Sequence, residues 1–263
     1  MTNKFINLAF ILYIHSLVFY AITYVSAKPK WRYGALAALV TAWIFQSIYL
    51  FMRWHVGGHF PLANQYESLV SMSWATTLIF LMLYRKSPTI WFGFWISVIN
   101  LVMLATCSFL DSSISPLVPA LQSNWLLFHV AVIMMGYAAL AISFIASLVY
   151  LVFYSRKPAN NKANELEKFN MRTMIIGYIL LTVGIILGAV WANEAWGSYW
   201  SWDPKETWSL VTWFVYTAGL HFHKARGWKQ ARMAWFSVVG FAFVLFTYFG
   251  VNYLMSGLHS YAN

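Results

Sequence analysis

The sequence predicts an all-α integral membrane protein with about eight transmembrane helices. Of its 263 residues, 61% are hydrophobic and only 9% are charged, whereas about a quarter of the residues of a typical water-soluble chain are charged. The apolar residues form repeated runs of about 20, the length of helix that crosses a bilayer core. Long unbroken runs favour helices over a β-barrel, because barrel strands alternate in polarity at every second residue.

Eight apolar runs are expected to form the membrane helices. They cover residues 5–25, 33–52, 66–84, 90–109, 124–154, 173–193, 206–222 and 234–256. The first run has neither a basic start nor an A-x-A-like cleavage site, so we expect a retained helix rather than a signal peptide. The fifth run is too long for one untilted crossing and is expected to extend beyond the bilayer.

Basic residues orient these helices. Fourteen of the 17 Lys and Arg residues fall in four connections, at 26–32, 85–89, 155–172 and 223–233. The positive-inside rule places these connections in the cytoplasm, and both termini are then extracytoplasmic. The loops 53–65, 110–123 and 194–205 also lie outside. Since the net charge of +10 is explained by topology, we expect no nucleic-acid partner.

We expect residues 1–263 to form a single membrane domain, with the polar stretch 155–170 as a linker-like segment between five spans and three. Cys107 is the only cysteine, which excludes an intrachain disulfide and C-x-x-C dithiol chemistry. All seven acidic residues lie outside the centres of the apolar runs. This argues against a proton-coupled transporter, because such carriers usually keep a carboxylate at membrane depth.

The segment WGSYWSWDPKETW, residues 196–208, concentrates aromatic side chains in one outer loop. An aromatic belt accounts for scattered interfacial tryptophans, but not easily for Trp196, Trp200 and Trp202 crowded together. Flat aromatic rings can stack on a flat, largely apolar ligand such as a porphyrin. The loop therefore predicts a binding surface for a ligand of that kind.

The acids of this segment favour a structural role. Asp203 to Glu206 has the pattern of a capping box with proline at the first helical position, which opens the seventh helix. The stretch PLANQYESL has a similar capping pattern, from Asn64 to Glu67, at the start of the third helix. We therefore expect both loops to be held rigidly by their helices.

Three histidines are candidate ligands, because neutral imidazole binds metals and haem iron at physiological pH. His129 lies about one turn into the fifth span, and His259 follows the eighth, so both are expected on the outer side with the tryptophans between them in the chain. Hydrogen bonding at the headgroups is the alternative for each. His221 ends the seventh span on the inner side, as a helix-terminal cation or as a second haem ligand.

These motifs together resemble the WWD-domain, haem-handling family of cytochrome c assembly proteins. The tryptophan segment is similar to the WWD signature of that family. Companion segments resemble its CcsA type, also called ResC, the larger subunit of the System II cytochrome c synthase. They are GGHFPLANQYESL, WLLFHVAVIMMGYA, LHFHKARGW and FTYFGVNYLMSGLHSYA, and the resemblance covers about residues 55–263.

The resemblance implies a complex that moves haem b across the membrane and joins it to the C-x-x-C-H motif of an apocytochrome c, which is cytochrome c synthase (haem lyase) activity. His129 and His259 match the external histidines that hold the haem iron. His221 matches a transmembrane histidine whose opposing ligand lies on the CcsB/ResB-type partner subunit. The family's surface that presents the haem corresponds here to Trp196, Trp200, Trp202 and Asp203.

The resemblance also implies a bacterial inner membrane or a plastid thylakoid membrane, with the WWD loop on the extracytoplasmic side. His15, His55, His59 and His223 match no ligand position. Two alternatives remain open: a membrane b-type cytochrome that uses its histidines for electron transfer, and a haem-loading factor that delivers haem to a carrier. Haem-loading members of the family usually have about six spans, and the DPKET continuation fits the synthase type better.

Overall fold

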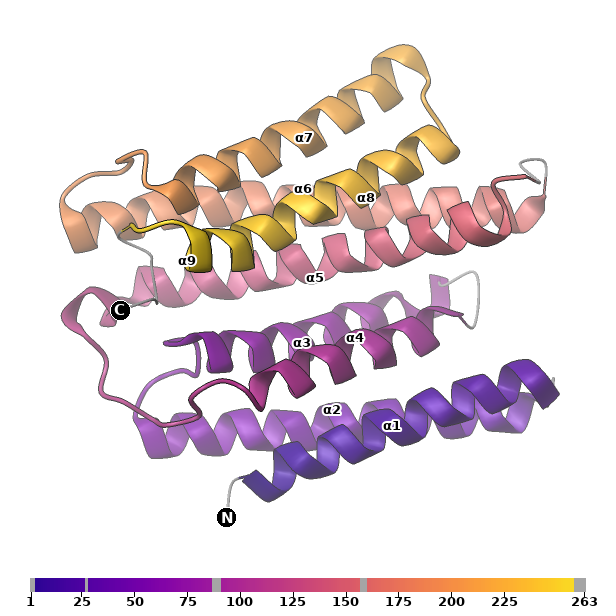
Figure 1. The fold of residues 1–263 in the computed structure, drawn as a ribbon, viewed down its shortest axis with the longest axis horizontal. Helices are drawn as coiled ribbons and strands as arrows, with labels where there is room; N and C mark the ends of the chain where they lie inside the picture. Colours follow the sequence, from indigo (N-terminus) through magenta and orange to yellow (C-terminus); the bar gives the residue numbers. More distant parts are fainter. Residues whose placement is uncertain (1–2, 27, 87–90, 157–159, 258–263) are drawn as a thin grey trace. The chain divides into compact units, whose positions relative to one another are not determined.

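The computed structural model describes residues 3–26, 28–86, 91–156 and 160–257, and within these ranges the chain is helical, with no strand (Figure 1). The α-helices are α1 (Asn3–Ser26), α2 (Pro29–Gly57), α3 (Gln65–Leu83), α4 (Trp91–Cys107), α5 (Asn124–Phe153), α6 (Asn161–Trp196), α7 (Pro204–Arg226), α8 (Ala231–Leu245) and α9 (Val251–Leu254). A π-helical stretch, η3 (Phe246–Gly250), makes α8 and α9 one continuous run. Each of the eight predicted runs coincides with a helix.

Among the described residues, six helices are long and apolar enough to cross a membrane: α1, α2, α3, α5, α6 and the α8–α9 run. Helix α4 is apolar but has only 17 residues. The fifth predicted run forms a helix of 30 residues, in keeping with the expected extension beyond the bilayer. The chain is thus a multi-pass helical membrane protein, whereas membrane crossing by α4 and α7 stays a prediction.

The chain forms two compact units, an N-terminal unit (Met1–Leu117) with α1–α4 and a C-terminal unit (Val118–Asn263) with α5–α9. The boundary lies in the connection before α5, not at the predicted linker. The predicted linker contains the connection between α5 and α6, but its residues from Asn161 onward form the first turns of α6. There the Asn160 side chain caps the helix, and Ala163 and Leu166 are buried between the polar residues at helical spacing.

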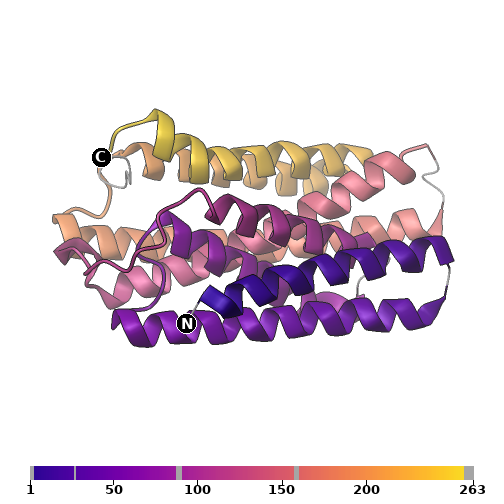
Figure 2. The same ribbon diagram turned by 60° about the horizontal axis from the view of Figure 1, so that its bottom comes forward.

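Buried polar side chains join the helices of the N-terminal unit, in which α1 and α2 lie side by side (Figure 2). The Tyr13 hydroxyl donates to Gln46 Oε1 at 2.8 Å, and Gln46 Nε2 donates to the Val70 carbonyl at 2.9 Å. Asn100 Nδ2 donates to Thr77 Oγ1 at 2.8 Å, and that oxygen lies 3.1 Å from the Tyr13 hydroxyl. Hydrogen bonds of this kind hold helices together where lipid gives no hydrophobic drive.

Glycines allow close packing in the C-terminal unit. A Cβ at Gly177 of α6 would lie 2.6 Å from Leu140 of α5, and one at Gly136 of α5 would meet the backbone of α6 at 3.2 Å. Small residues let helix backbones approach closely within a membrane. Helix α8 is joined to α5 by a contact of 2.8 Å between the hydroxyls of Ser143 and Ser237.

Candidate functional site

The candidate residues of the C-terminal unit gather mostly at one end of it. Figure 1 shows that the start of α5, the end of α6, the start of α7 and α9 all lie at this end. His129 belongs to the second turn of α5, and the tryptophan loop connects α6 to α7. Helix packing therefore brings together segments that are about 70 residues apart in the chain.

His129 is held in a defined orientation against α6. Its Nδ1 lies 2.7 Å from the Gly184 carbonyl oxygen, 55 residues away in the chain. Because a carbonyl oxygen only accepts, Nδ1 must carry the proton and donate it. The lone pair of the neutral ring is then on Nε2, which is the tautomer that a metal ligand needs.

Trp191 of α6 is a site residue that the sequence did not single out. Its ring lies nearly parallel to the imidazole of His129, with centroids 6.1 Å apart and an interplanar angle of 13°. The side chain is 4% exposed, and its Nε1 donates to the Ala120 carbonyl at 2.9 Å. In the sequence, Trp191 stands out only as a tryptophan five residues before the WWD segment. No spacing rule connects it to a histidine on another helix.

Trp196, Trp200 and Trp202 make edge-to-face contacts. Trp196, the last residue of α6, meets Trp191 at 4.7 Å and 62°, and Trp200 meets Trp202 at 5.8 Å and 89°. Trp202 is 69% exposed and has φ of +60°. A bulky residue rarely adopts this left-handed conformation, and such strain tends to occur at functional sites.

The capping box at the start of α7 is confirmed. The Asp203 carboxylate accepts from Lys205 N at 2.9 Å, and Glu206 Oε2 accepts from Asp203 N at 3.2 Å. Glu206 Oε2 also accepts from Ser201 N at 2.8 Å, which ties the loop to the helix. The expected structural role of these acids is thus observed, and it fixes the exit of the tryptophan loop.

Gly257, the last residue that the structure describes, lies against the same loop. A methyl group at Gly257 would overlap Asp203 Oδ2 and would lie 3.0 Å from Pro204 Cδ. His259, the second predicted external ligand, lies outside the described residues. Gly257, two residues before His259 in the chain, lies directly against the start of α7.

His221 lies near the other end of α7, where it is exposed and has an edge contact with Phe222. At about 1.5 Å per residue, it is about 25 Å along the helix from Pro204. The structure therefore does not place it with His129 or the loop, in keeping with a separate site. His223 is half-buried, and its Nδ1 lies 2.6 Å from the Trp228 carbonyl.

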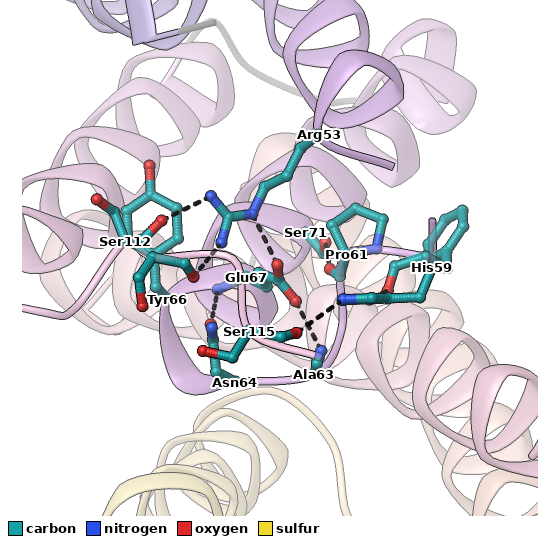
Figure 3. A network of polar contacts seen from close by, with 12 residues as sticks. Arg53, His59, Pro61, Ala63, Asn64, Tyr66, Glu67, Ser71, Ser112 and Ser115 are labelled. Carbon is teal, nitrogen blue, oxygen red and sulfur yellow. Dashed lines mark hydrogen bonds and ion pairs between the residues drawn. The ribbon is translucent and has the colours of Figure 1, made fainter. Parts of the chain in front are cut away.

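The N-terminal unit contains a polar network of its own (Figure 3). Arg53, 5% exposed, donates to Glu67 Oε1 at 2.7 Å and to the carbonyls of Ser112 and Ser113, each at 2.9 Å. Glu67 Oε2 accepts from Ala63 N at 2.8 Å. The predicted cap at Asn64 is also present, since its side chain accepts from Glu67 N. These contacts fix two loops of the unit.

The other histidines lie in the N-terminal unit. His15 is exposed midway along α1 with Nδ1 2.8 Å from the Ile11 carbonyl, His55 is exposed near the end of α2, and His59 Nε2 lies 3.3 Å from the Ser115 carbonyl. No group of three or more His, Cys, Asp or Glu residues that could hold a metal ion occurs within the described ranges.

Comparison with known proteins identifies the family. The family model described as "Cytochrome C assembly protein" matches residues 62–259, about three quarters of the chain. The chain belongs to the CcsA-type cytochrome c assembly family. It is 45% identical to the cytochrome c biogenesis protein CcsA of Chlamydomonas reinhardtii, in a match that covers 81% of this chain and 64% of that protein. With CcsA of Synechococcus sp. (strain CC9902), identity is 40%, over 97% and 95% of the two chains.

A solved structure shares the fold of this family member. The cytochrome c haem lyase CcmF superimposes with a TM-score of 0.71 over 98% of this chain, at 20% sequence identity. The chain spans 47% of the length of that protein, just as it spans less than two thirds of the Chlamydomonas relative. At this identity, the likeness to CcmF is one of fold.

Proposed function

We propose that this protein presents haem b at the extracytoplasmic face of a membrane and joins it to the C-x-x-C-H motif of apocytochrome c, together with a CcsB/ResB-type partner subunit. The observation that carries the proposal is the setting of His129. In a chain of the CcsA-type family, its imidazole is fixed by Gly184 in the ligand tautomer and lies parallel to Trp191, which contacts Trp196 at the edge of the tryptophan loop.

His129 and His259 are the proposed axial ligands of the haem iron. The Gly184 carbonyl holds the proton on His129 Nδ1, which leaves the lone pair of Nε2 available to an iron ion. The position of Gly257 against Asp203 supports this pairing, because His259 is two residues further along the chain. Two imidazoles saturate the axial positions of haem iron and exclude other ligands from it.

Trp196, Trp200 and Trp202 form the proposed haem-presenting surface, and Asp203 holds its end. Edge-to-face pairs leave ring faces for offset contact with a flat ligand. In thioether formation, each cysteine S–H adds across a haem vinyl group, so that a C–S and a C–H bond replace one C=C π bond and the S–H bond, without a net oxidant. The protein contributes position and orientation to this step.

His221 is the proposed inner ligand, which binds haem on its way to the external site. Its exposed position near the end of α7, far along the helix from the loop, suits coordination shared with a histidine of the partner subunit. This proposal requires eight membrane crossings, with α4 and α7 included, and both termini and the WWD loop outside. The membrane is then the bacterial inner membrane or the thylakoid membrane.

The test is replacement of the external histidines in the complete complex. His129→Ala and His259→Ala should each abolish holocytochrome c formation while the protein still accumulates in the membrane. Imidazole in the medium should partly restore assembly, because a free ligand can enter the space left by the missing ring. His223→Ala is the control and should assemble cytochrome c as the wild type does. Normal assembly in both external variants would refute the proposal.

The inner site has its own measurement. His221→Ala should lower total haem in the purified complex and starve the external site, and haem supplied from outside should bypass much of the defect. Full haem occupancy at the external site in this variant would return His221 to the role of a helix-terminal cation.

A further inference from the structure

The space around His129 is limited by α6. A Cβ at Gly188 would lie 2.6 Å from His129 Cε1 and 2.7 Å from Nδ1, well inside van der Waals contact. A methyl group at this position would therefore displace the imidazole from its place against the Gly184 carbonyl, one helical turn earlier on α6. The ring is enclosed between a hydrogen-bond acceptor and a bare stretch of backbone.

Trp191 limits the ring from a third direction. It lies three residues after Gly188, on the same side of α6, and its indole is nearly parallel to the imidazole. The indole cannot turn easily, because Nε1 donates to the Ala120 carbonyl and the side chain is 4% exposed. The Trp191 indole also has an edge contact at 4.7 Å with Trp196, at the start of the loop.

We propose that Gly188 and Trp191 are positioning residues, which set the plane of the His129 imidazole as an axial ligand and couple that plane to the tryptophan loop. This inference rests on the proposed function. The hydrogen bond to Gly184 fixes the tautomer but leaves rotation of the ring about the bond axis, and the parallel indole removes that freedom. A shift of Trp196 with bound haem is then transmitted through Trp191 to the ligand.

A merely structural role predicts a different result from a positioning role. If Gly188 and Trp191 only pack α6 against its neighbours, replacing them lowers stability and leaves the coordination of retained haem unchanged. If they position His129, the folded protein changes its haem coordination. The optical spectrum distinguishes these cases, because six-coordinate bis-histidine haem is low-spin and haem that has lost one ligand is not.

The experiment compares Trp191→Leu and Gly188→Ala with two matched controls in the purified complex. Gly177→Ala introduces a methyl group into the same α5–α6 contact, against Leu140 rather than His129. Trp213→Leu removes another indole of the unit, a half-buried one whose Nε1 donates to Thr182 Oγ1 at 2.8 Å. Haem content, the optical spectrum and the unfolding midpoint of haem-free protein are measured for each variant.

Trp191→Leu and Gly188→Ala should lose the low-spin spectrum and retain haem about 10- to 100-fold more weakly, as expected when the group that orients a metal ligand is removed. Trp191→Phe, which keeps a ring but no N–H donor, should be intermediate. Both controls should keep the wild-type spectrum even where the unfolding midpoint falls. A wild-type spectrum in Trp191→Leu, while His129→Ala loses it, would overturn the positioning role alone. An unchanged spectrum in His129→Ala would instead overturn the proposed function.

Discussion

The polar core of the N-terminal unit and the tryptophan loop of the C-terminal unit place their side chains differently. In that polar core, Tyr13 bonds Gln46 and Asn100 bonds Thr77. Arg53 and Glu67 are buried there as an ion pair. At the loop end of the C-terminal unit, Trp202 is exposed and strained instead. Both units follow the physics of a helical membrane protein, and the surface that we propose for haem lies in the second.

Under the proposed function, burial of polar groups is a poor marker of the site. The Arg53–Glu67 pair would stand out in any search for charged residues at depth, but every contact described for it ends on the protein's own backbone and side chains. Buried charges that are fully hydrogen-bonded add conformational definition more than stability. Exposed aromatic surface held in a strained backbone is the stronger indication of a site.

The largest expected effect is a loss of stability in the N-terminal unit, from a substitution that leaves the proposed haem site unchanged. Arg53→Met leaves the Glu67 carboxylate buried and unpaired, so the free energy of unfolding in detergent should fall by about 3–5 kcal/mol. The double variant Arg53→Met/Glu67→Gln should recover much of this loss, because no charge then remains buried. Protein that stays folded should bind haem with the wild-type spectrum. A double variant as unstable as the single one would show that the two groups do not act as a pair.

A second substitution separates binding from folding in the C-terminal unit. Trp202→Gly removes an exposed ring, so haem retention should fall by about 1–3 kcal/mol, by analogy with losses of base stacking. Folding should not suffer, because glycine adopts φ of +60° without the cost that a tryptophan carries. The triple replacement of Trp196, Trp200 and Trp202 should lose bound haem altogether, as an absorbance spectrum of purified protein will show.

Gln230→Gly is the matched control, because Gln230 also has a positive φ, 52°, and follows the far end of α7. It should keep its haem. Equal haem content in wild type and the triple variant would contradict the stacking role.

Sequence patterns predicted the helices well, because membrane helices are specified by local composition. All eight runs were found, and the caps at Asn64 and Asp203 followed from their local motifs. The division into two units was not predicted, since it depends on which helices pack together. The helical part of the polar segment 155–170 was not predicted for a similar reason. Its polar composition hides an apolar helical face, which the burial of Ala163 and Leu166 shows.

The residues of the candidate site also differ in how far the sequence could predict them. Residues within one motif, such as Trp200, Trp202 and Asp203, could be singled out from the chain alone. Trp191 and Gly188 could not be singled out in this way, because only the fold shows that they lie against His129 on another helix. Long-range packing, rather than local chemistry, limited what the sequence could reveal.

A smaller effect tests whether Asp203 acts only as a cap. Asp203→Ala removes the acceptor for Lys205 N and should lower the free energy of unfolding by about 1 kcal/mol. Asn160→Ala is the matched control at the start of α6, where the side chain accepts from Lys162 N at 2.8 Å. The two losses should be similar, with haem retained in both variants. Loss of haem in Asp203→Ala alone would give this carboxylate a direct part in haem binding.

The smallest effect concerns pH and the residue beside that cap. Burial lowers the pKa of Lys205 to about 8, an effect that the nearby Asp203 carboxylate partly offsets; Lys205 Nζ also donates to Asn252 Oδ1 at 3.1 Å. Above pH 8, the unfolded chain still binds a proton that the folded chain has released. Stability should therefore rise with pH, by less than about 1 kcal/mol between pH 7 and 8.5. Denaturant unfolding in detergent across this range should show the rise in wild type and in Lys162→Met, an exposed lysine at the same position in α6, but not in Lys205→Met. If Lys205→Met keeps the full rise, another group is responsible and Lys205 remains charged throughout the range.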